Sequence, residues 1–258
     1  MKTSVRERLN RGEVLIGTFI KMTDPSAAEI IGLLHFDFAV VDNEHVAMNK
    51  ESIVNIIRAS ENVGLNTIIR TKDTSKTDIL QFLDSGAVGV QVPNVNSKED
   101  AERVVDAVKY APAGSRGFAP SHRAAHYNLL DKKAFIQTSN DETLTVIHCE
   151  SRASLACLDN ILSVRDVDVV FIGPMDLSQA FNVPGEVDHP DVAEAIESII
   201  SITKKHGKAL GTVAGDSDEA ERLMRRGFQY IAISSDQGFI MNGAKQAINA
   251  LKGNVKMG

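Results

Sequence analysis

Four short apolar runs in this chain each end abruptly in ionisable side chains. The run at residues 38–41 is followed by Asp42, Asn43, Glu44 and His45, and the other three end in Arg70, Glu150 and Asp176. Continuous apolar runs of this length are typical of strands buried on both faces. In a (β/α)8 barrel the carboxyl ends of parallel strands carry the active site. The pattern therefore predicts an α/β protein, a TIM barrel, with chemistry at its strand ends.

The spacing of the remaining segments agrees with this fold. The chain has 258 residues, close to the ~250 typical of one such barrel. We predict a single domain over residues 1–258 with a short helix at 4–10. Eight strands are expected at 14–20, 38–41, 67–70, 88–92, 145–149, 167–172, 209–213 and 230–234. Eight helices are expected at 25–34, 49–64, 75–86, 97–110, 154–162, 191–206, 218–226 and 239–252.

Composition excludes several other classes of protein. The net charge of −6 and pI near 5.7 give no general attraction for nucleic acid or an anionic membrane. No apolar run approaches the ~18 residues of a membrane span, and the charged amino terminus lacks the apolar core of a secretory signal. The only cysteines, Cys149 and Cys157, form no disulfide framework and are expected in the core. A cytoplasmic location is expected.

One stretch, residues 112–128, interrupts the alternation of strands and helices. It reads PAGSRGFAPSHRAAHYN and has no clean periodicity. Long irregular loops in compact domains are usually functional or disordered. We expect this basic, aromatic loop to lie over the barrel mouth, with Arg123 selecting the distal end of a substrate.

Two carboxylates are predicted to lie side by side at the barrel mouth. Glu150 and Asp176 end the fifth and sixth strands. With waters and a chelating substrate, such a pair suits Mg2+ or Mn2+, which prefer oxygen ligands. The alternative is that each carboxylate caps a helix or pairs with an arginine. His148 is a less favoured third ligand.

The other strand ends suggest an acid–base site. His45 follows Asp42 by three residues, and a carboxylate can orient an imidazole that acts as a base near neutral pH; the alternative is an ordinary loop histidine. Arg70 must be paired or face the mouth, where it can hold a carboxylate or an enolate oxygen. Gly173 and Pro174 form a bare turn for a substrate carboxylate. Schiff-base chemistry at Lys21 or Lys72 is the competing mechanism.

Several of these segments together resemble a known family. FDFAVVDNEH, Arg70, LDSGAVGVQVPNV, APAGSRG, the glutamate of HCES and VVFIGPMDLS are similar, in order, to the HpcH/HpaI family of 2-oxo-acid aldolases. The similarity runs from about residue 15 to residue 236. The family commonly has glutamine where this chain has His148, and a neutral residue where it has Lys21.

The resemblance implies a metal-dependent barrel that makes or breaks a carbon–carbon bond with pyruvate as nucleophile. Glu150 and Asp176 would bind Mg2+ or Mn2+, with Co2+ as a further candidate, and no organic cofactor is expected. The His45–Asp42 dyad would be the base and Arg70 would stabilise the enolate. Gly173, Pro174, His148 and Arg123 would contact substrate. A homohexamer, a trimer of dimers, is implied, with the last helix packed on a neighbouring subunit.

We therefore expect a class II pyruvate aldolase that cleaves a 4-hydroxy-2-oxo acid to pyruvate and an aldehyde. One alternative keeps the enolate and changes the partner, giving a citrate-forming or citrate-cleaving enzyme. The extra basic residues Lys21, Lys72 and His148 suit that more anionic partner. The second alternative is a catalytically weak barrel that binds a small oxo acid.

Overall fold

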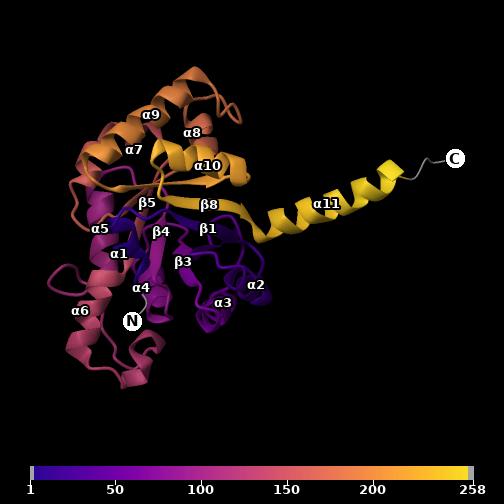
Figure 1. Ribbon diagram of the computed structural model, residues 1–258. Coiled ribbons are helices and arrows are strands. Elements are labelled where there is room, and N and C mark those ends of the chain that lie inside the picture. The colour runs from indigo at the N-terminus through magenta and orange to yellow at the C-terminus, as the bar shows by residue number, and fades with distance from the viewer. Residues whose placement is uncertain (1–2, 255–258) are drawn as a thin grey trace.

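The protein is a closed barrel of eight parallel strands. The computed structural model describes residues 3–254, and residues 252–254 as backbone alone. The strands pair in chain order and β8 closes on β1. Figure 1 shows β8 beside β1, with helices around the barrel. The predicted TIM barrel is confirmed, and each predicted strand agrees to within a residue or two. The strands are β1 (Leu15–Ile20), β2 (Phe38–Asp42), β3 (Asn66–Arg70), β4 (Gly89–Val92), β5 (Leu144–Cys149), β6 (Val169–Ile172), β7 (Ala209–Ala214) and β8 (Tyr230–Ser235).

Most helices pack around the barrel, and several of them begin at a residue whose side chain caps the first turn. Side-chain oxygens of Ser4, Asn49, Ser75 and Ser97 accept backbone N–H groups in the first turns of their helices, each cap contributing about 1 kcal/mol. The helices are α1 (Val5–Asn10), α2 (Ser26–Leu33), α3 (Lys50–Asn62), α4 (Lys76–Asp84), α5 (Lys98–Val108), η1 (Arg123–Asn128), α6 (Lys132–Glu142), α7 (Arg152–Leu162), α8 (Pro174–Ala180), α9 (Pro190–Lys205), α10 (Ser217–Arg226) and α11 (Asp236–Asn254). The sequence did not predict η1, α6 or α8.

The core has two layers because successive residues of a strand face opposite sides. One apolar cluster lies between strands and helices and includes Cys149, with Cys157 packed against it, as predicted. The other fills the barrel interior, where the rings of Phe38 and Tyr230 stack with centroids 4.0 Å apart. Gly17 of β1 faces this stack. A Cβ there would lie 2.3 Å from the Phe38 ring, so only glycine fits.

The segment at residues 112–128 does not lie over the barrel mouth, and that prediction is wrong. Arg123 donates from Nη1 to Oε1 of Glu61 (2.7 Å) and to the carbonyl of Ser85 (2.9 Å), near the ends of α3 and α4. Both positions are at the amino-terminal end of the barrel. The reason is topological: the segment follows α5, which returns the chain from the carboxyl end of β4 to the opposite end. Arg123 therefore does not reach the strand tips of its own barrel.

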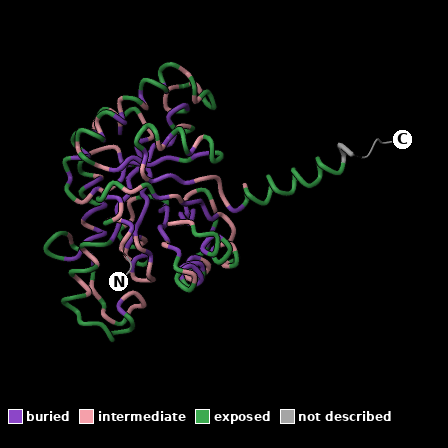
Figure 2. The backbone as a smooth tube through the Cα atoms, viewed as in Figure 1, coloured by how far each residue is buried: buried purple, intermediate pink, exposed green. Residues whose placement is uncertain are grey.

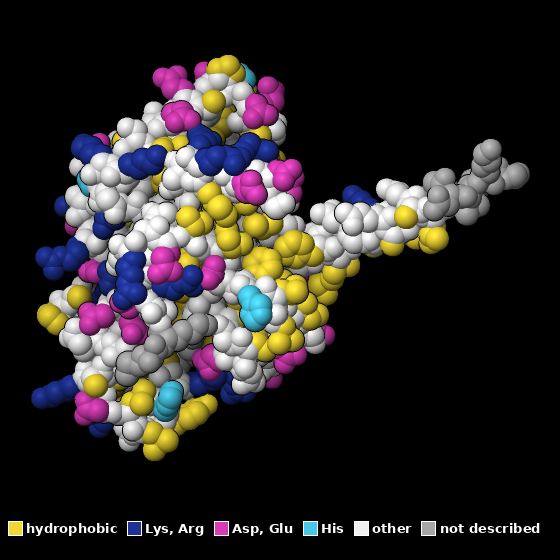
Figure 3. Space-filling view, viewed as in Figure 1, with side chains coloured by type: hydrophobic (Ala, Val, Ile, Leu, Met, Phe, Trp, Pro, Cys, Tyr) yellow, Lys and Arg dark blue, Asp and Glu magenta, His cyan; other side chains and the backbone are white. Residues whose placement is uncertain are grey.

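The last helix, α11, leaves the barrel and projects away from it (Figure 1). Figure 2 shows that its backbone is exposed along nearly its whole length. Figure 3 shows hydrophobic side chains gathered where the helix leaves the barrel and along the helix itself. Exposed apolar residues in this region are Ile30, Leu33 and Leu34 near α2, and Phe239, Ile240, Met241, Ile248 and Leu251 of α11. Among the described residues, none of the helices combines the length and apolarity needed to cross a membrane.

Candidate active site

The centre of the site is a buried ion pair between neighbouring strand ends. Asp42 and Arg70 are register partners on β2 and β3. Nε and Nη2 of Arg70 contact Oδ1 and Oδ2 of Asp42 at 3.0 and 2.6 Å, a two-point pair. Burial by itself would raise the pKa of Asp42, but the Arg70 guanidinium and the backbone N–H groups of His45 and Glu44 lower it overall. Arg70 is thus held rigidly, with its side chain 10% exposed.

His45 and Glu44 lie on the loop directly after this pair. The N–H groups of both residues donate to Oδ1 of Asp42 at 3.1 Å. Asp42 was expected to contact the His45 ring. Its carboxylate instead accepts a hydrogen bond from the backbone N–H of His45. Nε2 of His45 lies 3.8 Å from Oε2 of Glu44, which also contacts Nη1 of Arg70 at 3.3 Å. The His45 side chain is 61% exposed, so its ring is open to a ligand.

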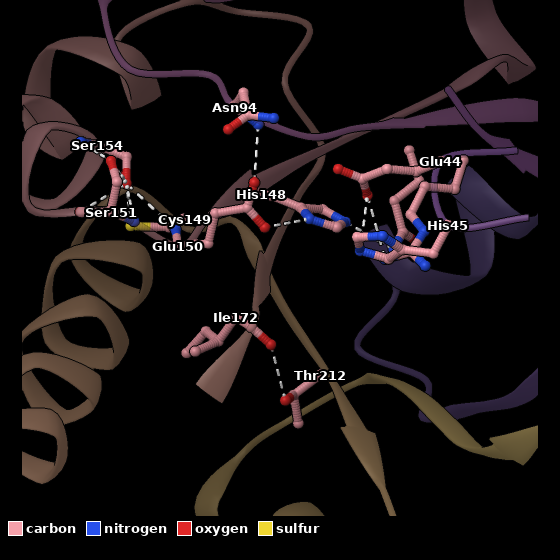
Figure 4. Close-up of polar contacts among 12 residues, drawn as sticks. Glu44, His45, Asn94, His148, Cys149, Glu150, Ser151, Ser154, Ile172 and Thr212 are labelled. Carbon is pink, nitrogen blue, oxygen red and sulfur yellow. Dashed lines mark hydrogen bonds and ion pairs between the residues drawn. The ribbon is translucent and has the colours of Figure 1, made fainter. Parts of the chain in front are cut away.

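The surroundings of Glu44 disfavour its charged form. Burial raises its pKa, and the charge of Glu150 raises it further, while Arg70, His148 and His45 act in the opposite direction. Glu44 is thus within electrostatic reach of the β5 side of the mouth. Figure 4 shows Glu44 and His45 facing the ring of His148, with Glu150 beyond it.

Glu150, just past β5, is fixed by two donors. Its Oε1 accepts the N–H of Asn94 at 2.8 Å, and its Oε2 lies 2.7 Å from Nδ1 of His148. Burial would raise the pKa of Glu150, but the hydrogen bond and charge of His148, the Asn94 N–H and Arg70 together lower it. The carboxyl group is therefore ionised at neutral pH, as a ligand for a cation must be.

His148 belongs to a hydrogen-bonded chain that runs through the barrel interior. A carboxylate only accepts hydrogen bonds, so Nδ1 of His148 carries the proton and donates to Glu150. Nε2 then accepts from the amide nitrogen of Gln91 at 2.8 Å. Oε1 of Gln91 accepts from the hydroxyl of Tyr230 at 3.1 Å. The His148 ring also stacks on Phe171, with centroids 5.0 Å apart. These partners fix both the tautomer and the orientation of His148.

Gln91 and Tyr230 were missed in reading the sequence. The available signal was Gln91 itself, an amide inside the apolar run at residues 88–92. A buried polar side chain in a strand needs a partner, and the register places Gln91 beside β5, which carries His148. Tyr230 carries no comparable signal, because a tyrosine in a strand usually packs as an aromatic residue.

Glu150 and Asp176 lie around one point, next to Gly173. A Cβ built on Gly173 would be 2.8 Å from Oδ2 of Asp176 and 3.6 Å from Oε2 of Glu150. The missing side chain leaves the space between the two carboxylates open. Upstream, Thr212 of β7 donates to the carbonyl of Ile172 at 3.0 Å (Figure 4), which anchors the end of β6. Asp176 is exposed in the first turn of α8.

This donor set fits a hard divalent cation that keeps several open positions. Two carboxylates leave the remaining positions for waters and substrate oxygens, as Mg2+ and Mn2+ prefer. Within residues 3–254, no group of three or more His, Cys, Asp or Glu side chains is arranged to hold a metal. His148 is thus not a third ligand in this arrangement, since both of its ring nitrogens are engaged.

The turn at Gly173 and Pro174 is the start of a helix. Gly173 is the N-cap of α8 and Pro174 occupies its first turn. Proline has no N–H, so only Gly173 of the two can donate to a substrate carboxylate. Lys21 lies at the mouth, with Nζ 3.9 Å from Oδ2 of Asp42, whereas Lys72 is exposed.

Comparisons with known proteins identify the family of this chain and solved structures with the same fold. The family model described as HpcH/HpaI aldolase/citrate lyase matches residues 15–243. The 2-dehydro-3,6-dideoxy-6-sulfogluconate aldolase of Pseudomonas putida is 34% identical, over 95% of each chain. The crystal structure of an HpcH/HpaI aldolase from Desulfitobacterium hafniense DCB-2 has a TM-score of 0.93 at 25% identity and covers 100% of both chains. The structure of the citrate synthase SbnG has a TM-score of 0.87 at 28% identity, covering 98% and 99% of the chains.

The chain is thus an enzyme of the aldolase class. It belongs to the HpcH/HpaI aldolase/citrate lyase family, which confirms the resemblance noted in its sequence motifs.

Proposed function

We propose that the protein is a divalent-metal-dependent aldolase that cleaves a 4-hydroxy-2-oxo acid into pyruvate and an aldehyde, and catalyses the reverse addition. The observation that carries this proposal is the arrangement of the mouth. The rigid Arg70–Asp42 pair and the open His45 lie on the β2–β3 side, and Glu150 and Asp176 lie together around Gly173 on the β5–β6 side. The aldolase relative supports the same reaction class.

Glu150 and Asp176 are the residues proposed to hold Mg2+ or Mn2+, with Co2+ as a further candidate, and we propose no organic cofactor. A bound divalent cation supplies Lewis acidity at the 2-oxo group of the substrate, which favours formation of an enolate. The two donors to Glu150, from Asn94 and His148, keep its carboxylate oriented. Such supporting hydrogen bonds are typical of groups that hold metals.

The other residues of the site are proposed to stabilise the enolate, to act as the base and to position that base. Arg70 stabilises negative charge on the enolate oxygen, since its orientation is fixed in advance by Asp42. His45 takes up the proton of the 4-hydroxyl group as the C3–C4 bond breaks, either directly or through a water. Asp42 serves His45 by holding its backbone N–H. Gly173 lies next to the side-chain carboxylates of Glu150 and Asp176. We expect the carboxylate of the substrate to bind at this position.

A second candidate function keeps the enolate and replaces the aldehyde with a more anionic partner, as in a citrate-forming or citrate-cleaving enzyme. Two observations favour it: the likeness to the citrate synthase SbnG and the ammonium group of Lys21 at the mouth. The aldolase assignment is preferred because the relative that matches at 34% identity is an aldolase.

A panel of substrates separates these functions. Pyruvate release is measured from several 4-hydroxy-2-oxo acids, and citrate formation and cleavage are measured in parallel, with Mn2+ present. The proposal predicts pyruvate from the hydroxy-oxo acids and no turnover of citrate. Citrate turnover alone would support the second candidate. Binding of oxo acids without turnover of any compound would support a catalytically weak binding barrel.

We further propose that the protein acts in the cytoplasm as a homohexamer, a trimer of dimers, with α11 packed on a neighbouring subunit. Exposed Ile240, Met241, Ile248 and Leu251 on α11 support this, because apolar helix faces usually mark interfaces. Light scattering tests the assembly. The proposal predicts six subunits for the wild type and smaller species for an Ile248→Glu, Leu251→Glu variant. A wild-type monomer would contradict it.

A further inference from the structure

Three side chains with polar groups lie buried inside the barrel, next to its apolar interior cluster. Gln91 of β4 and Tyr230 of β8 are fully buried, and His148 of β5 is 2% exposed. They form the hydrogen-bonded chain described above, which ends at Oε2 of Glu150. Buried polar groups cost free energy unless they are paired, and here each one is paired with the next. Of the four side chains, only Glu150 is proposed to bind a ligand.

The ring of Tyr230 is held in place from two sides. It stacks on Phe38 of β2, with an angle of 14° between the ring planes. On the β7 side, a Cβ built on Gly211 would lie 2.9 Å from Cδ1 of Tyr230, so the backbone of β7 leaves room for the ring and for no side chain. The packing therefore fixes the Tyr230 hydroxyl at its position 3.1 Å from Oε1 of Gln91.

Each hydrogen bond in this chain determines the orientation of the next group. The hydroxyl of Tyr230 donates to Oε1 of Gln91, so the amide nitrogen of Gln91 faces His148 and donates to its Nε2. Because Nε2 accepts, the proton of the neutral ring is on Nδ1, which donates to Oε2 of Glu150 at 2.7 Å. The orientation of the Glu150 carboxylate thus depends on Tyr230, with two side chains in between.

The hydrogen-bonded chain can orient groups, but it cannot carry protons along its length. The amide of Gln91 has donors and an acceptor and no group that titrates near neutral pH, so it interrupts any relay between Tyr230 and His148. Tyr230 is also fully buried and offers no exit to solvent. The effect of Gln91 and Tyr230 on Glu150 is therefore one of geometry.

We propose that Gln91 and Tyr230 are positioning residues of the metal site, which act through His148 to hold the Glu150 carboxylate in the orientation that binds the divalent cation. The inference rests on the proposed metal site at Glu150 and Asp176 and adds two residues that do not hold the cation themselves. Removing a partner of a metal-binding group typically weakens metal binding about 10- to 100-fold. Gln91 should have an effect of this order, and Tyr230, one hydrogen bond further away, a smaller one.

The test measures the Mn2+ affinity of the metal-free protein by titration calorimetry. The wild type is compared with Tyr230→Phe, Gln91→Leu, His148→Phe and the double variant His148→Phe, Tyr230→Phe. Phenylalanine at position 230 keeps the ring against Phe38 and removes only the hydroxyl. Tyr110→Phe is the matched control, because Tyr110 is also buried and its hydroxyl has no hydrogen-bond partner in the described part of the protein. Circular dichroism first shows that each variant is folded.

Tyr230→Phe should weaken Mn2+ binding about 2- to 10-fold, the order expected for one hydrogen bond between uncharged groups. Gln91→Leu should weaken it about 10- to 100-fold. In the His148→Phe background, Tyr230→Phe should have no further effect, because the hydrogen-bonded chain no longer reaches Glu150. Such non-additivity is the mark of residues that act through a shared partner. Tyr110→Phe should bind Mn2+ as the wild type does.

Other outcomes would overturn the proposal in distinguishable ways. If Tyr230→Phe keeps the wild-type affinity, or weakens Mn2+ binding by the same factor with and without His148, Tyr230 does not act through His148 although the metal site stands. If the wild type binds no Mn2+, the proposed metal site fails together with this inference. If Gln91→Leu does not fold, the comparison of Tyr230→Phe in the two backgrounds still decides the question.

Discussion

Nδ1 of His148 donates to Oε2 of Glu150 across 2.7 Å, and the other ring nitrogen of His148 accepts from Gln91. His148 was expected to contact substrate or metal. It instead supports Glu150, a proposed metal ligand, through this hydrogen bond. We predict that His148→Phe, which keeps a ring against Phe171 and removes the donor, lowers Mn2+ affinity about 10- to 100-fold. Titration calorimetry of the metal-free protein measures this change.

The matched control is His148→Gln, because a glutamine amide can still donate to Glu150. This variant should retain more of the Mn2+ affinity than His148→Phe. Both variants must be shown to be folded, since leaving the amide of Gln91 without its partner costs about 1–3 kcal/mol. Unchanged affinity in folded His148→Phe would show that the hydrogen bond does not position Glu150.

A second prediction concerns Lys109, which is fully buried at the end of α5. Its ammonium group donates to the carbonyls of Asn140 and Thr143 at 2.7 and 2.9 Å. Burial, with a smaller contribution from Arg6, lowers the pKa of Lys109 to about 8. In the unfolded chain a lysine has a pKa of about 10.4. Between these values the unfolded state binds a proton that the folded state does not, so the free energy of unfolding rises with pH.

The measurement is urea unfolding of the wild type and of Lys109→Met from pH 7 to pH 10.5. As the pH rises above 8, the free energy of unfolding of the wild type should increase by up to about 3 kcal/mol relative to that of the variant. Below pH 8 the difference between the two proteins should not change. Lys98→Met, which changes a lysine exposed on α5, should show no such trend. A difference between wild type and Lys109→Met that stays flat over this range would contradict the account.

Much of the fold could be predicted because strands and most helices carry an apolar pattern. The helix α6 was missed for a physical reason: none of its residues is buried, so it has no apolar stripe to read. The helix α8 spans seven residues and begins at a Gly-Pro pair, which reads as a turn. Residues 112–128 were predicted at the barrel mouth because they follow β4 in the sequence. They lie at the opposite end because α5 comes between and returns the chain to the amino-terminal end of the barrel.

The candidate site could be predicted only as far as strand ends determine it. Arg70, Glu150 and Asp176 lie at the barrel mouth because strand ends converge there. Which side chains pair with each other depends on register and rotamers, which the sequence does not give. Asp42 therefore binds Arg70 and the backbone of His45, where a contact with the His45 ring was expected. The buried hydrogen bonds of Gln91 with His148 and Tyr230 could not be predicted from the sequence for the same reason.

A third prediction separates the base from the enolate stabiliser. Oxaloacetate decarboxylation also passes through a pyruvate enolate, but it has no 4-hydroxyl proton to remove. Loss of a general base typically costs about 100- to 10,000-fold, and loss of an enolate stabiliser about 100- to 1,000-fold. His45→Ala should therefore lose most aldol cleavage and keep much of the decarboxylation. Arg70→Ala should lose both.

Steady-state rates of both reactions, measured on the same enzyme preparations with bound Mn2+ quantified, provide the comparison. His45 lies on the exposed rim, so its truncation should leave the fold intact. Arg70→Ala leaves the Asp42 carboxylate without its partner, which destabilises by about 3–5 kcal/mol, so its folding must be verified. Equal losses of both reactions in folded, metal-loaded His45→Ala would remove His45 from the role of selective base.

Glu150 and Asp176 are proposed to hold a divalent cation that is required for cleavage of a hydroxy-oxo acid. The most direct measurement is pyruvate release from a 4-hydroxy-2-oxo acid by the chelator-treated protein, before and after adding Mn2+ or Mg2+, with Glu150→Gln and Asp176→Asn alongside. We expect no turnover without metal and recovery in the wild type when metal is added. Mn2+ binding should be about 10- to 100-fold weaker in each variant, the order of loss for a disturbed metal site. Full activity of the wild type in a metal-free sample would contradict it.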